Sequence, residues 1–377
     1  MTQNPVTKYF SQGLVLRCLI GLSLFAFSME LCARIDDNIK YQAPLIGVYS
    51  PDILRERDHD GVKHNVPNIR FEKWQINEFG FRGQAFPVEK PEGVKRIVCM
   101  GTSESFGLYE DAGKEWPSQL AEMLSGKEGY QVINASVVGL SLPQFAPYIE
   151  KYVLRFQPDI VILYLNPYFS AQESLVEKAS VAQRVPEPPP RWKPKGRPTQ
   201  GFSIMPRLAA KMKVAVKGAL PPSLVRRYQL WKLSGEIKTL EDKELKGKKP
   251  ADNMPEGVLE SFKKDLIRLV TFLKDRRIQV VLSSYPVLIS YDNLEKYQEI
   301  FLDNRRFSIR LSLKGMIEIP SQCNAQIESV AREFGIAFVD NAGRIPRTTE
   351  FFGDNVHYTN KGAQQVGAQF KHLLLMQ

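Results

Sequence analysis

Two hydrophobic patterns alternate along the chain after residue 95. Short unbroken apolar runs are typical of strands that helices cover on both faces, and apolar residues recurring every three or four positions are typical of amphipathic helices. The predicted strands are RIVCM at 96–100, YQVINAS at 130–136, DIVILYL at 159–165, IQVVLSS at 278–284 and IAFVD at 336–340. The predicted helices span 116–124, 143–156, 256–272, 322–333 and 360–375.

This alternation predicts an α/β fold with a doubly wound, mostly parallel five-stranded sheet, because parallel strands need a long crossover and helices usually supply it. The pattern is interrupted, so we divide the domain into a first part at 94–170 and a second part at 256–377. Residues 36–93 are polar and rich in turn residues, and we interpret them as an extended lead-in.

Residues 13–33 form an apolar run that is about 30 Å long as a helix, just enough to span a bilayer. We predict an uncleaved signal-anchor, with residues 1–35 as cytoplasmic tail and transmembrane helix. A cleaved signal peptide and a buried or interfacial helix remain open, although Leu31-Cys32-Ala33 supplies only one clearly small residue for a cleavage site.

Charges near the two ends of this run and beyond them predict its orientation. Lys8 and Arg17 lie on the near side, and Glu30, Asp36 and Asp37 lie on the far side. Because cytoplasmic flanks are enriched in basic residues, we place the N-terminus in the cytoplasm and the catalytic body outside it, in the periplasm or at the cell surface. The predicted protein is single-pass.

Most of the net charge of +10 belongs to one segment. Residues 184–249 contain 17 Lys and Arg against 5 Asp and Glu, so the rest of the chain is close to neutral. We interpret residues 171–255 as a proline-rich, basic insertion, with amphipathic pieces at 207–217 and 224–240. It is either a solvated, partly helical excursion or a contact to an anionic surface, such as a membrane or an acidic polymer. Nothing resembles a nucleic-acid-binding module.

No metal or cofactor is predicted. The sequence RDHDGVKH at 57–64 matches no zinc or calcium ligand spacing in full. Cys18 and Cys32 fall in the apolar run, Cys99 falls in a predicted strand and Cys323 has no evident partner, so we expect no disulfide framework.

Ser103 is the first candidate for chemistry. It lies in Gly101-Thr102-Ser103-Glu104-Ser105, directly after the predicted strand 96–100. A serine in such a turn lies at the carboxyl edge of the sheet, where open α/β folds bind ligands. An ordinary loop would look similar, and the turn lacks both a phosphate-loop ending and a Gly-x-Ser-x-Gly elbow.

Asp354 and His357 form the second candidate. A carboxylate three residues before a histidine can accept the proton of one ring nitrogen and leave the other nitrogen free as a base. The alternative is a helix-capping Asp beside an exposed His. Gly139 and Asn166 follow two other predicted strands at the same edge, where they could donate hydrogen bonds to an oxyanion, although both are also common turn residues.

These four blocks, in this order, resemble the SGNH (GDSL-like) hydrolase family, whose name lists Ser, Gly, Asn and His. The resemblance covers about 95–170 and 256–377 and implies a flavodoxin-like SGNH fold. It implies Ser103 as nucleophile, an Asp354 and His357 pair as orienting acid and base, and an oxyanion hole of Ser103, Gly139 and Asn166. The lead-in NEFGFR at 77–82 and PDIVIL at 158–163 look like an exported bacterial subgroup.

Two positions depart from the family pattern. Gly-Thr-Ser replaces the usual Gly-Asp-Ser, and Asn166-Pro167 replaces the usual Asn-Asp. Neither change removes an atom that the mechanism needs, but Pro167 puts the orientation of the Asn166 loop in doubt. Ser105 is the rival nucleophile, and Ser103 is preferred because it lies two residues after Gly101.

The expected function is hydrolysis of O-acyl esters outside the cytoplasm. An O-acyltransferase that modifies a cell-surface or exopolysaccharide sugar would use the same triad, and a non-catalytic carbohydrate-binding or assembly protein could keep the same fold. The expected partners are an acyl-ester substrate, such as an acylated polysaccharide, the membrane through the N-terminal helix, and an anionic surface through residues 184–249. The sequence leaves open the acyl group, the alcohol and the oligomeric state.

Overall fold

The structure is a computed structural model that describes residues 5–41, 45–46, 51–125, 129–168 and 206–376. The proline-rich start of the predicted insertion lies outside the described residues. The chain divides into two compact units. The smaller unit comprises Met1–Pro51, Arg70–Glu72 and Val185–Arg226, and the larger unit comprises Asp52–Ile69, Lys73–Arg184 and Arg227–Gln377.

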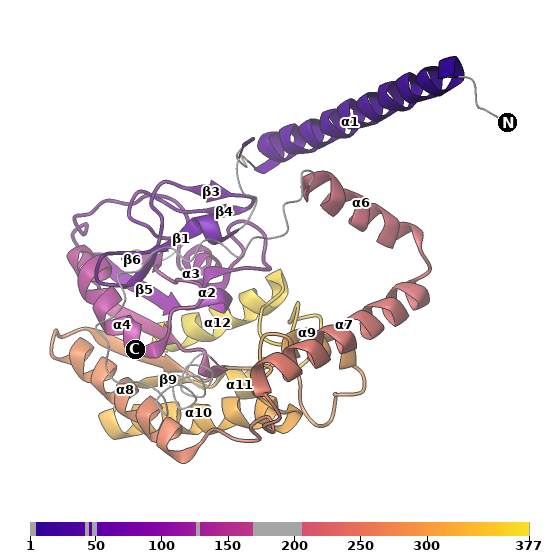
Figure 1. The fold of residues 1–377 in the computed structure, drawn as a ribbon. Helices are drawn as coiled ribbons and strands as arrows, with labels where there is room; N and C mark the ends of the chain where they lie inside the picture. Colours follow the sequence, from indigo (N-terminus) through magenta and orange to yellow (C-terminus); the bar gives the residue numbers. More distant parts are fainter. Residues whose placement is uncertain (1–4, 42–44, 47–50, 126–128, 169–205, 377) are drawn as a thin grey trace. The chain divides into compact units, whose positions relative to one another are not determined.

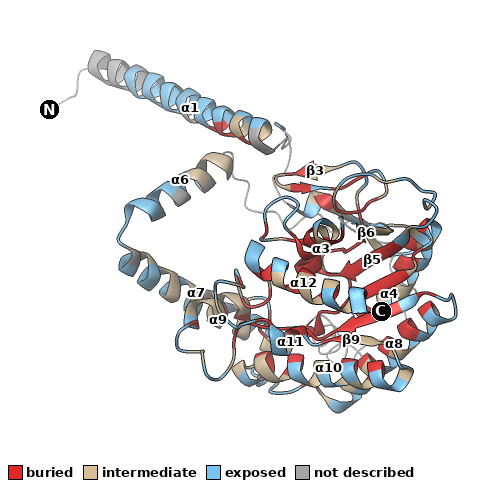
Figure 2. Ribbon diagram, turned by 180° about the vertical axis from the view of Figure 1, so that it is seen from behind, coloured by how far each residue is buried: buried red, intermediate tan, exposed pale blue. Residues whose placement is uncertain are grey.

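A parallel five-stranded sheet in the order β6-β5-β7-β8-β9 forms the centre of the larger unit (Figure 1). Val98 of β5 lies opposite Ile133 of β6 on one side and Val161 of β7 on the other. The apolar runs of β5, β7 and β8 are buried, as Figure 2 shows for β5, and those of the edge strands β6 and β9 are partly buried. The predicted α/β fold is therefore confirmed. The strands are β5 (Lys95–Gly101), β6 (Tyr130–Asn134), β7 (Ile160–Tyr164), β8 (Gln279–Ser283) and β9 (Ala337–Val339).

Helices cover the sheet in two groups. On one side α3 and α12 pack together and contact β6 and β9, and on the other α8 and α10 pack against β8 while α4 packs against α8 (Figure 1). A Cβ atom at Gly367 of α12 would lie 3.2 Å from the carbonyl oxygen of Trp116, so glycine allows α12 to approach α3 closely. The helices are α3 (Trp116–Leu124), α4 (Leu142–Tyr148), α8 (Glu256–Lys274), α10 (Leu313–Phe334) and α12 (Asn360–Met376).

Two helices differ by more than two residues from the predicted ranges. The helix predicted at 143–156 is regular only to Tyr148 and continues as a π-helical turn, η2 (Ile149–Val153), and a 3-10 turn, η3 (Leu154–Phe156). Pro147 removes a helical hydrogen bond just before this change. The helix predicted from 322 begins at Leu313, where the Ser312 hydroxyl accepts from the Gly315 N–H and caps the first turn. The unpredicted helices are α2 (Ser103–Phe106), α9 (Gln298–Arg305) and α11 (Asn341–Arg344).

The lead-in joins the edge of the sheet through its NEFGFR sequence. The Asn77 side-chain oxygen accepts from the N–H groups of Phe79 and Phe81, both at 3.0 Å, and so holds the turn. The Arg82 N–H then donates to the Asn134 carbonyl at the end of β6 (3.0 Å). The short elements of this region are η1 (Pro51–Leu54), β1 (Arg55–Arg57), β2 (Lys63–Asn65), β3 (Arg70–Phe71) and β4 (Trp74–Gln75).

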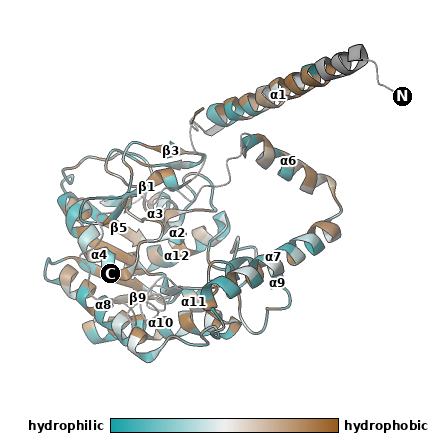
Figure 3. Cartoon of the chain, viewed as in Figure 1, coloured by the Kyte–Doolittle hydropathy of each residue, from teal (hydrophilic) through white to brown (hydrophobic). Residues whose placement is uncertain are grey.

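The smaller unit contains α1 (Pro5–Tyr41) and α6 (Pro206–Ala219). Within α1, Leu14–Ile39 is long and apolar enough to cross a membrane, and its side chains are mostly exposed (Figures 2 and 3). A third helix, α7 (Pro222–Leu245), begins in this unit and continues in the larger one. There its carboxylates pair with arginines of the segment after α9, as in Glu236 with Arg306 (3.1 Å).

Candidate active site

Ser103 is the first residue of α2, a single helical turn directly after β5. The turn is tight because a Cβ atom at Gly101 would lie 2.2 Å from the Ser105 hydroxyl and 3.0 Å from the Tyr164 carbonyl oxygen. β5 lies between β6 and β7, so Ser103 occupies the carboxyl edge where the strand order reverses. Ligands of open α/β sheets bind at this point.

Ser105 is held in a different way from Ser103. Its side chain is fully buried, and its hydroxyl accepts a hydrogen bond from the Trp116 indole (3.1 Å). Among the described residues, the Ser103 hydroxyl makes no hydrogen bond. Ser105 therefore has a structural partner, while Ser103 has a hydroxyl available for chemistry, and this difference favours Ser103 as the nucleophile.

Asp354 and His357 contact each other in the loop before α12. One Asp354 oxygen accepts from the backbone N–H groups of Val356 and His357 at 2.8 Å each, and the other lies 2.7 Å from His357 Nδ1. The loop thus fixes the carboxylate by local hydrogen bonds and the carboxylate fixes the ring. This arrangement places a proton on Nδ1 and leaves Nε2 as the basic nitrogen.

The pKa shifts of Asp354 and His357 are those expected of a histidine base beside a carboxylate anion. Burial lowers the pKa of His357, but the hydrogen bond and charge of Asp354, together with the charges of Glu104 and Glu110, outweigh it and raise the pKa above its ordinary value. Burial raises the pKa of Asp354, but the contacts with His357 outweigh it and lower the pKa. His357 Nε2 is buried and has no hydrogen-bond partner in the described part of the chain.

Tyr109 covers the histidine. Its ring stacks on the imidazole with centroids 5.0 Å apart and planes inclined by 18°. A Cβ atom at Gly353 would lie 2.8 Å from the Tyr109 ring, so glycine there makes room for the tyrosine. Nothing in the sequence around Tyr109 indicated this contact.

Asn166, the predicted side-chain donor to the oxyanion, already has partners. Its amide nitrogen donates to Glu104 Oε1 (2.6 Å) and to the Tyr285 hydroxyl (2.9 Å), and its oxygen accepts from the Tyr168 N–H (2.9 Å). This last bond spans Pro167, which has no N–H to satisfy. The structure thus places Asn166 beside the residue that follows Ser103, with both amide hydrogens engaged.

Gly139 lies in the loop after β6 with a φ of +72°, a conformation that favours glycine. Its carbonyl oxygen accepts from Lys63 Nζ (2.7 Å), and its N–H has no acceptor among the described residues. The Val137 N–H of the same loop donates to the Gly101 carbonyl (3.1 Å), which ties this loop to the end of β5.

Glu104 and Glu110 are buried carboxylates that sequence reasoning missed. Glu104 is 1% exposed and accepts from Asn166, from the Tyr285 hydroxyl (2.5 Å) and from the Thr102 hydroxyl. Burial raises the pKa of Glu110 to about 8. Since both act on the pKa of His357, the Ser103 turn and the His357 loop lie within electrostatic range, although no hydrogen bond joins Ser103 to His357 in the described residues.

The loop RDHDGVKH brings the possible metal ligands of Asp58, His59 and Asp60 within 4.8 Å of one another. The Lys151 ammonium already bridges Asp58 (2.7 Å) and Asp60 (2.6 Å). Burial raises the pKa of Asp58, but hydrogen bonds from Lys151 and Tyr152 outweigh it and lower the pKa. A lysine therefore supplies the positive charge in this cluster, and nothing here indicates a metal site.

No family model and no curated protein matches this chain. Solved structures similar to it include a GDSL-like lipase from Bacteroides thetaiotaomicron, with 13% identity, a TM-score of 0.41 and coverage of 76% of this chain and 91% of that one. A lipase/acylhydrolase from Enterococcus faecalis is 14% identical, with a TM-score of 0.40 and coverage of 74% of this chain and 95% of that one. A catalytic mutant of an acetylxylan esterase from Geobacillus stearothermophilus is 11% identical, with a TM-score of 0.40 and coverage of 74% of this chain and 93% of that one. These likenesses are too distant to assign an activity to this chain.

Proposed function

We propose that this chain is a serine-dependent ester hydrolase of the SGNH type, with Ser103 as nucleophile, His357 as base and Asp354 as the orienting acid. The observation that carries the proposal is the Asp354 and His357 pair, with 2.7 Å between carboxylate and Nδ1 and an unpartnered Nε2. The turn that carries Ser103 begins at the carboxyl edge of the sheet, and the charge of the neighbouring Glu104 raises the pKa of His357.

In the proposed reaction, His357 Nε2 takes the Ser103 proton as the serine oxygen attacks the ester carbonyl carbon. The alcohol then leaves with that proton, and an acyl-enzyme remains on Ser103. Water, deprotonated by the same nitrogen, attacks the acyl carbon; the bond to Ser103 breaks, the proton returns from His357 to the serine oxygen, and the acid is released. Transfer of the acyl group to a sugar hydroxyl would use the same residues.

The oxyanion hole in this proposal consists of the Ser103 and Gly139 N–H groups and the Asn166 amide. Asn166 can donate only if one of its hydrogens leaves Glu104 or Tyr285 when substrate binds. If it does donate, Asn166→Ala should lower turnover by about 10² to 10³ with little change in substrate binding. Unchanged turnover in a folded variant would mean that the hole consists of backbone donors.

A second candidate function is a non-catalytic carbohydrate-binding or assembly module. The engaged Asn166 amide and the missing hydrogen bond between Ser103 and His357 favour it. Labelling with a fluorophosphonate probe, mapped by mass spectrometry, separates the two functions. Labelling at Ser103 supports the hydrolase, whereas an unlabelled, folded protein supports the binding module.

We also propose that α1 anchors the chain in a membrane, with the N-terminus in the cytoplasm and the larger unit outside. The length and apolar character of Leu14–Ile39 support this arrangement, as does the charge difference across it. Reporter fusions after residue 40 test the orientation with one enzyme active only in the cytoplasm and one active only after export. Activity of the cytoplasmic reporter alone would reverse the topology.

A further inference from the structure

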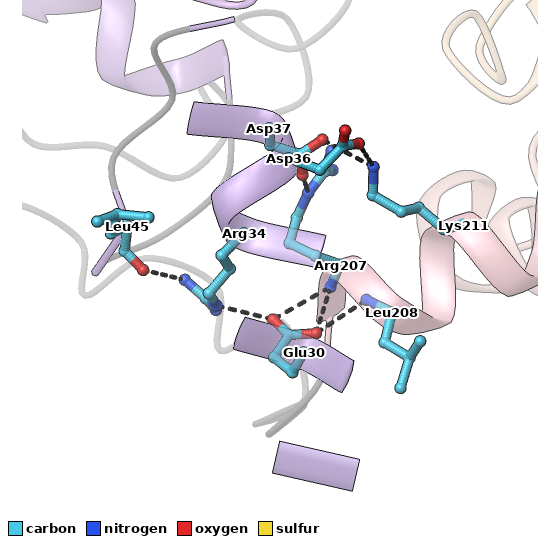
Figure 4. Close-up of polar contacts among 8 residues, drawn as sticks. All are labelled: Glu30, Arg34, Asp36, Asp37, Leu45, Arg207, Leu208 and Lys211. Carbon is cyan, nitrogen blue, oxygen red and sulfur yellow. Dashed lines mark hydrogen bonds and ion pairs between the residues drawn. The ribbon is translucent and has the colours of Figure 1, made fainter. Parts of the chain in front are cut away.

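Glu30 of α1 caps the beginning of α6. Its carboxylate accepts from the backbone N–H groups of Arg207 (3.2 Å) and Leu208 (2.8 Å), and from Arg34 Nε one turn further along α1 (2.8 Å) (Figure 4). The first N–H groups of a helix have no partner within it, and a negative charge there is favourable. These contacts explain how a carboxylate that is only 4% exposed is stabilised on an apolar helix.

Two further acidic residues of α1 contact the first two turns of α6. Asp37, which is 1% exposed, pairs with the Arg207 guanidinium. Lys211 Nζ lies 2.6 Å from Asp36 and 3.1 Å from Asp37 (Figure 4). Arg207 and Lys211, on one side of α6, thus attach this helix to α1, and the other sides of α6 do not take part in the attachment.

A second side of α6 is apolar and exposed. At about 100° per residue, positions 208, 212, 215, 216 and 219 share one sector of the helix. Met212 is 57% exposed and Val216 is 55% exposed, and Leu220, directly after the helix, is 46% exposed. Exposed Lys213 lies at the border of this sector. This apolar stripe (Met212, Val216 and Leu220) does not face the acidic residues of α1.

The position along α1 at which α6 is attached indicates what the exposed side of α6 contacts. The segment Leu14–Met29 of α1 has Arg17 near its start as its one charged residue and rises roughly 24 Å, most of the hydrocarbon thickness of a bilayer, and Glu30 follows it directly. In the proposed anchoring, on which this step rests, Glu30 lies near the bilayer surface and α6 begins there. An amphipathic helix with exposed apolar residues beside lysine is the kind that lies in the interfacial layer.

We propose that α6 lies in the interfacial layer of the membrane that α1 crosses, with the apolar stripe among the upper acyl chains and Lys213 among anionic phospholipid headgroups. The acidic residues of α1 set its depth and direction. This assigns one part of the basic segment 184–249 to a lipid surface. A free phosphate or a soluble polyanion would satisfy the lysine but would leave the apolar stripe in water.

The experiment uses the full chain in vesicles of phosphatidylcholine, with or without a third of phosphatidylglycerol. Cys18 and Cys32, both exposed on α1, are changed to serine, and a fluorescent label is attached to Val216→Cys. The matched control is Val88→Cys in the larger unit, a valine of similar exposure (46%). Flotation with the vesicles tests the anchoring, and quenching by lipids brominated high in the acyl chains tests the position of α6.

We expect brominated lipid to quench the label at 216 at least about twofold and the label at 88 hardly at all, since interfacial helices bury their apolar face roughly 5–10 Å deep. Lys213→Glu should weaken the quenching only in vesicles that contain phosphatidylglycerol. A chain that fails to float overturns the anchoring. A chain that floats but whose label at 216 is quenched by aqueous iodide and not by brominated lipid overturns the inference about α6. Shielding from both quenchers would mean that protein covers the stripe, and that also overturns it.

Discussion

Replacing Asp354 by asparagine separates the catalytic role of the carboxylate from its structural role. The oxygen that accepts from Val356 and His357 can remain an acceptor in Asp354→Asn. The amide NH₂ must then face His357 Nδ1, so Nδ1 becomes an acceptor and the ring proton moves to Nε2. The imidazole would then present a proton to Ser103 where the reaction needs a base.

The expected loss is large because the wrong tautomer dominates. Such a change in a Ser-His-Asp triad costs about 10⁴-fold in kcat, or about 5.4 kcal/mol at 1.36 kcal/mol per tenfold. The loss of stability should be smaller, about 1 to 3 kcal/mol, because charge-assisted hydrogen bonds become neutral ones and none is removed. The assays are hydrolysis of a chromogenic short-chain ester and denaturant unfolding of the same samples.

Asp58→Asn is the matched control. Asp58 also accepts two backbone N–H groups with one oxygen, from Asp60 (2.9 Å) and Val62 (3.0 Å), and contacts side chains with the other. This variant should lose comparable stability and keep its activity. The reasoning is refuted if folded Asp354→Asn retains activity within tenfold of the parent, or if Asp58→Asn loses as much.

Variants of the buried serines and carboxylates of the site test their roles one at a time. Ser103→Ala should abolish ester hydrolysis, roughly 10⁴-fold, while Ser105→Ala should keep substantial activity; equal losses in both, with neither serine labelled by the probe, would remove Ser103 as nucleophile. Because His357 must be neutral to act as base and the charge of Glu104 raises its pKa, Glu104→Gln should move the acid limb of the kcat/KM profile to lower pH; an unmoved limb contradicts this. Burial raises the pKa of Glu110 from 4.5 to about 8, so the folded state keeps this proton to higher pH than the unfolded state does, and stability should fall as pH rises between these values. Glu110→Gln should flatten that slope in denaturant unfolding at several pH values. An unchanged slope would show that burial does not raise the pKa of Glu110.

The parts of the fold that depend on local sequence could be predicted. The apolar run of β5 indicates a strand whatever the rest of the chain does, and the predicted helix at 116–124 has the bounds of α3. The Asp354 and His357 contact also follows from a spacing of three residues, because one tight turn brings the two side chains together. Each of these features needs only a short piece of chain.

The surroundings of Ser103 could not be predicted in this way. Glu104 looks like an ordinary polar loop residue, and it is buried because Asn166 and Tyr285, 62 and 181 positions away, bring hydrogen bonds to it. No hydrophobic pattern within a single strand or helix predicts a contact between residues so far apart in the sequence. For the same reason the sequence suggested Asn166 as a free donor, although its amide has two acceptors in the folded chain.

The cap on α6 has a consequence for the order of assembly. Glu30 and the N–H group of Arg207 are 177 positions apart, so Glu30 is synthesised long before its partner. At about 5–20 residues per second, this carboxylate waits roughly 10–35 s, with Arg34 as its partner within the same helix. During that interval Asp37 also lacks Arg207 and Lys211, with which it pairs in the folded chain. A ribosome stalled before residue 207 would therefore leave α1 easier to extract from the membrane than one stalled after α6.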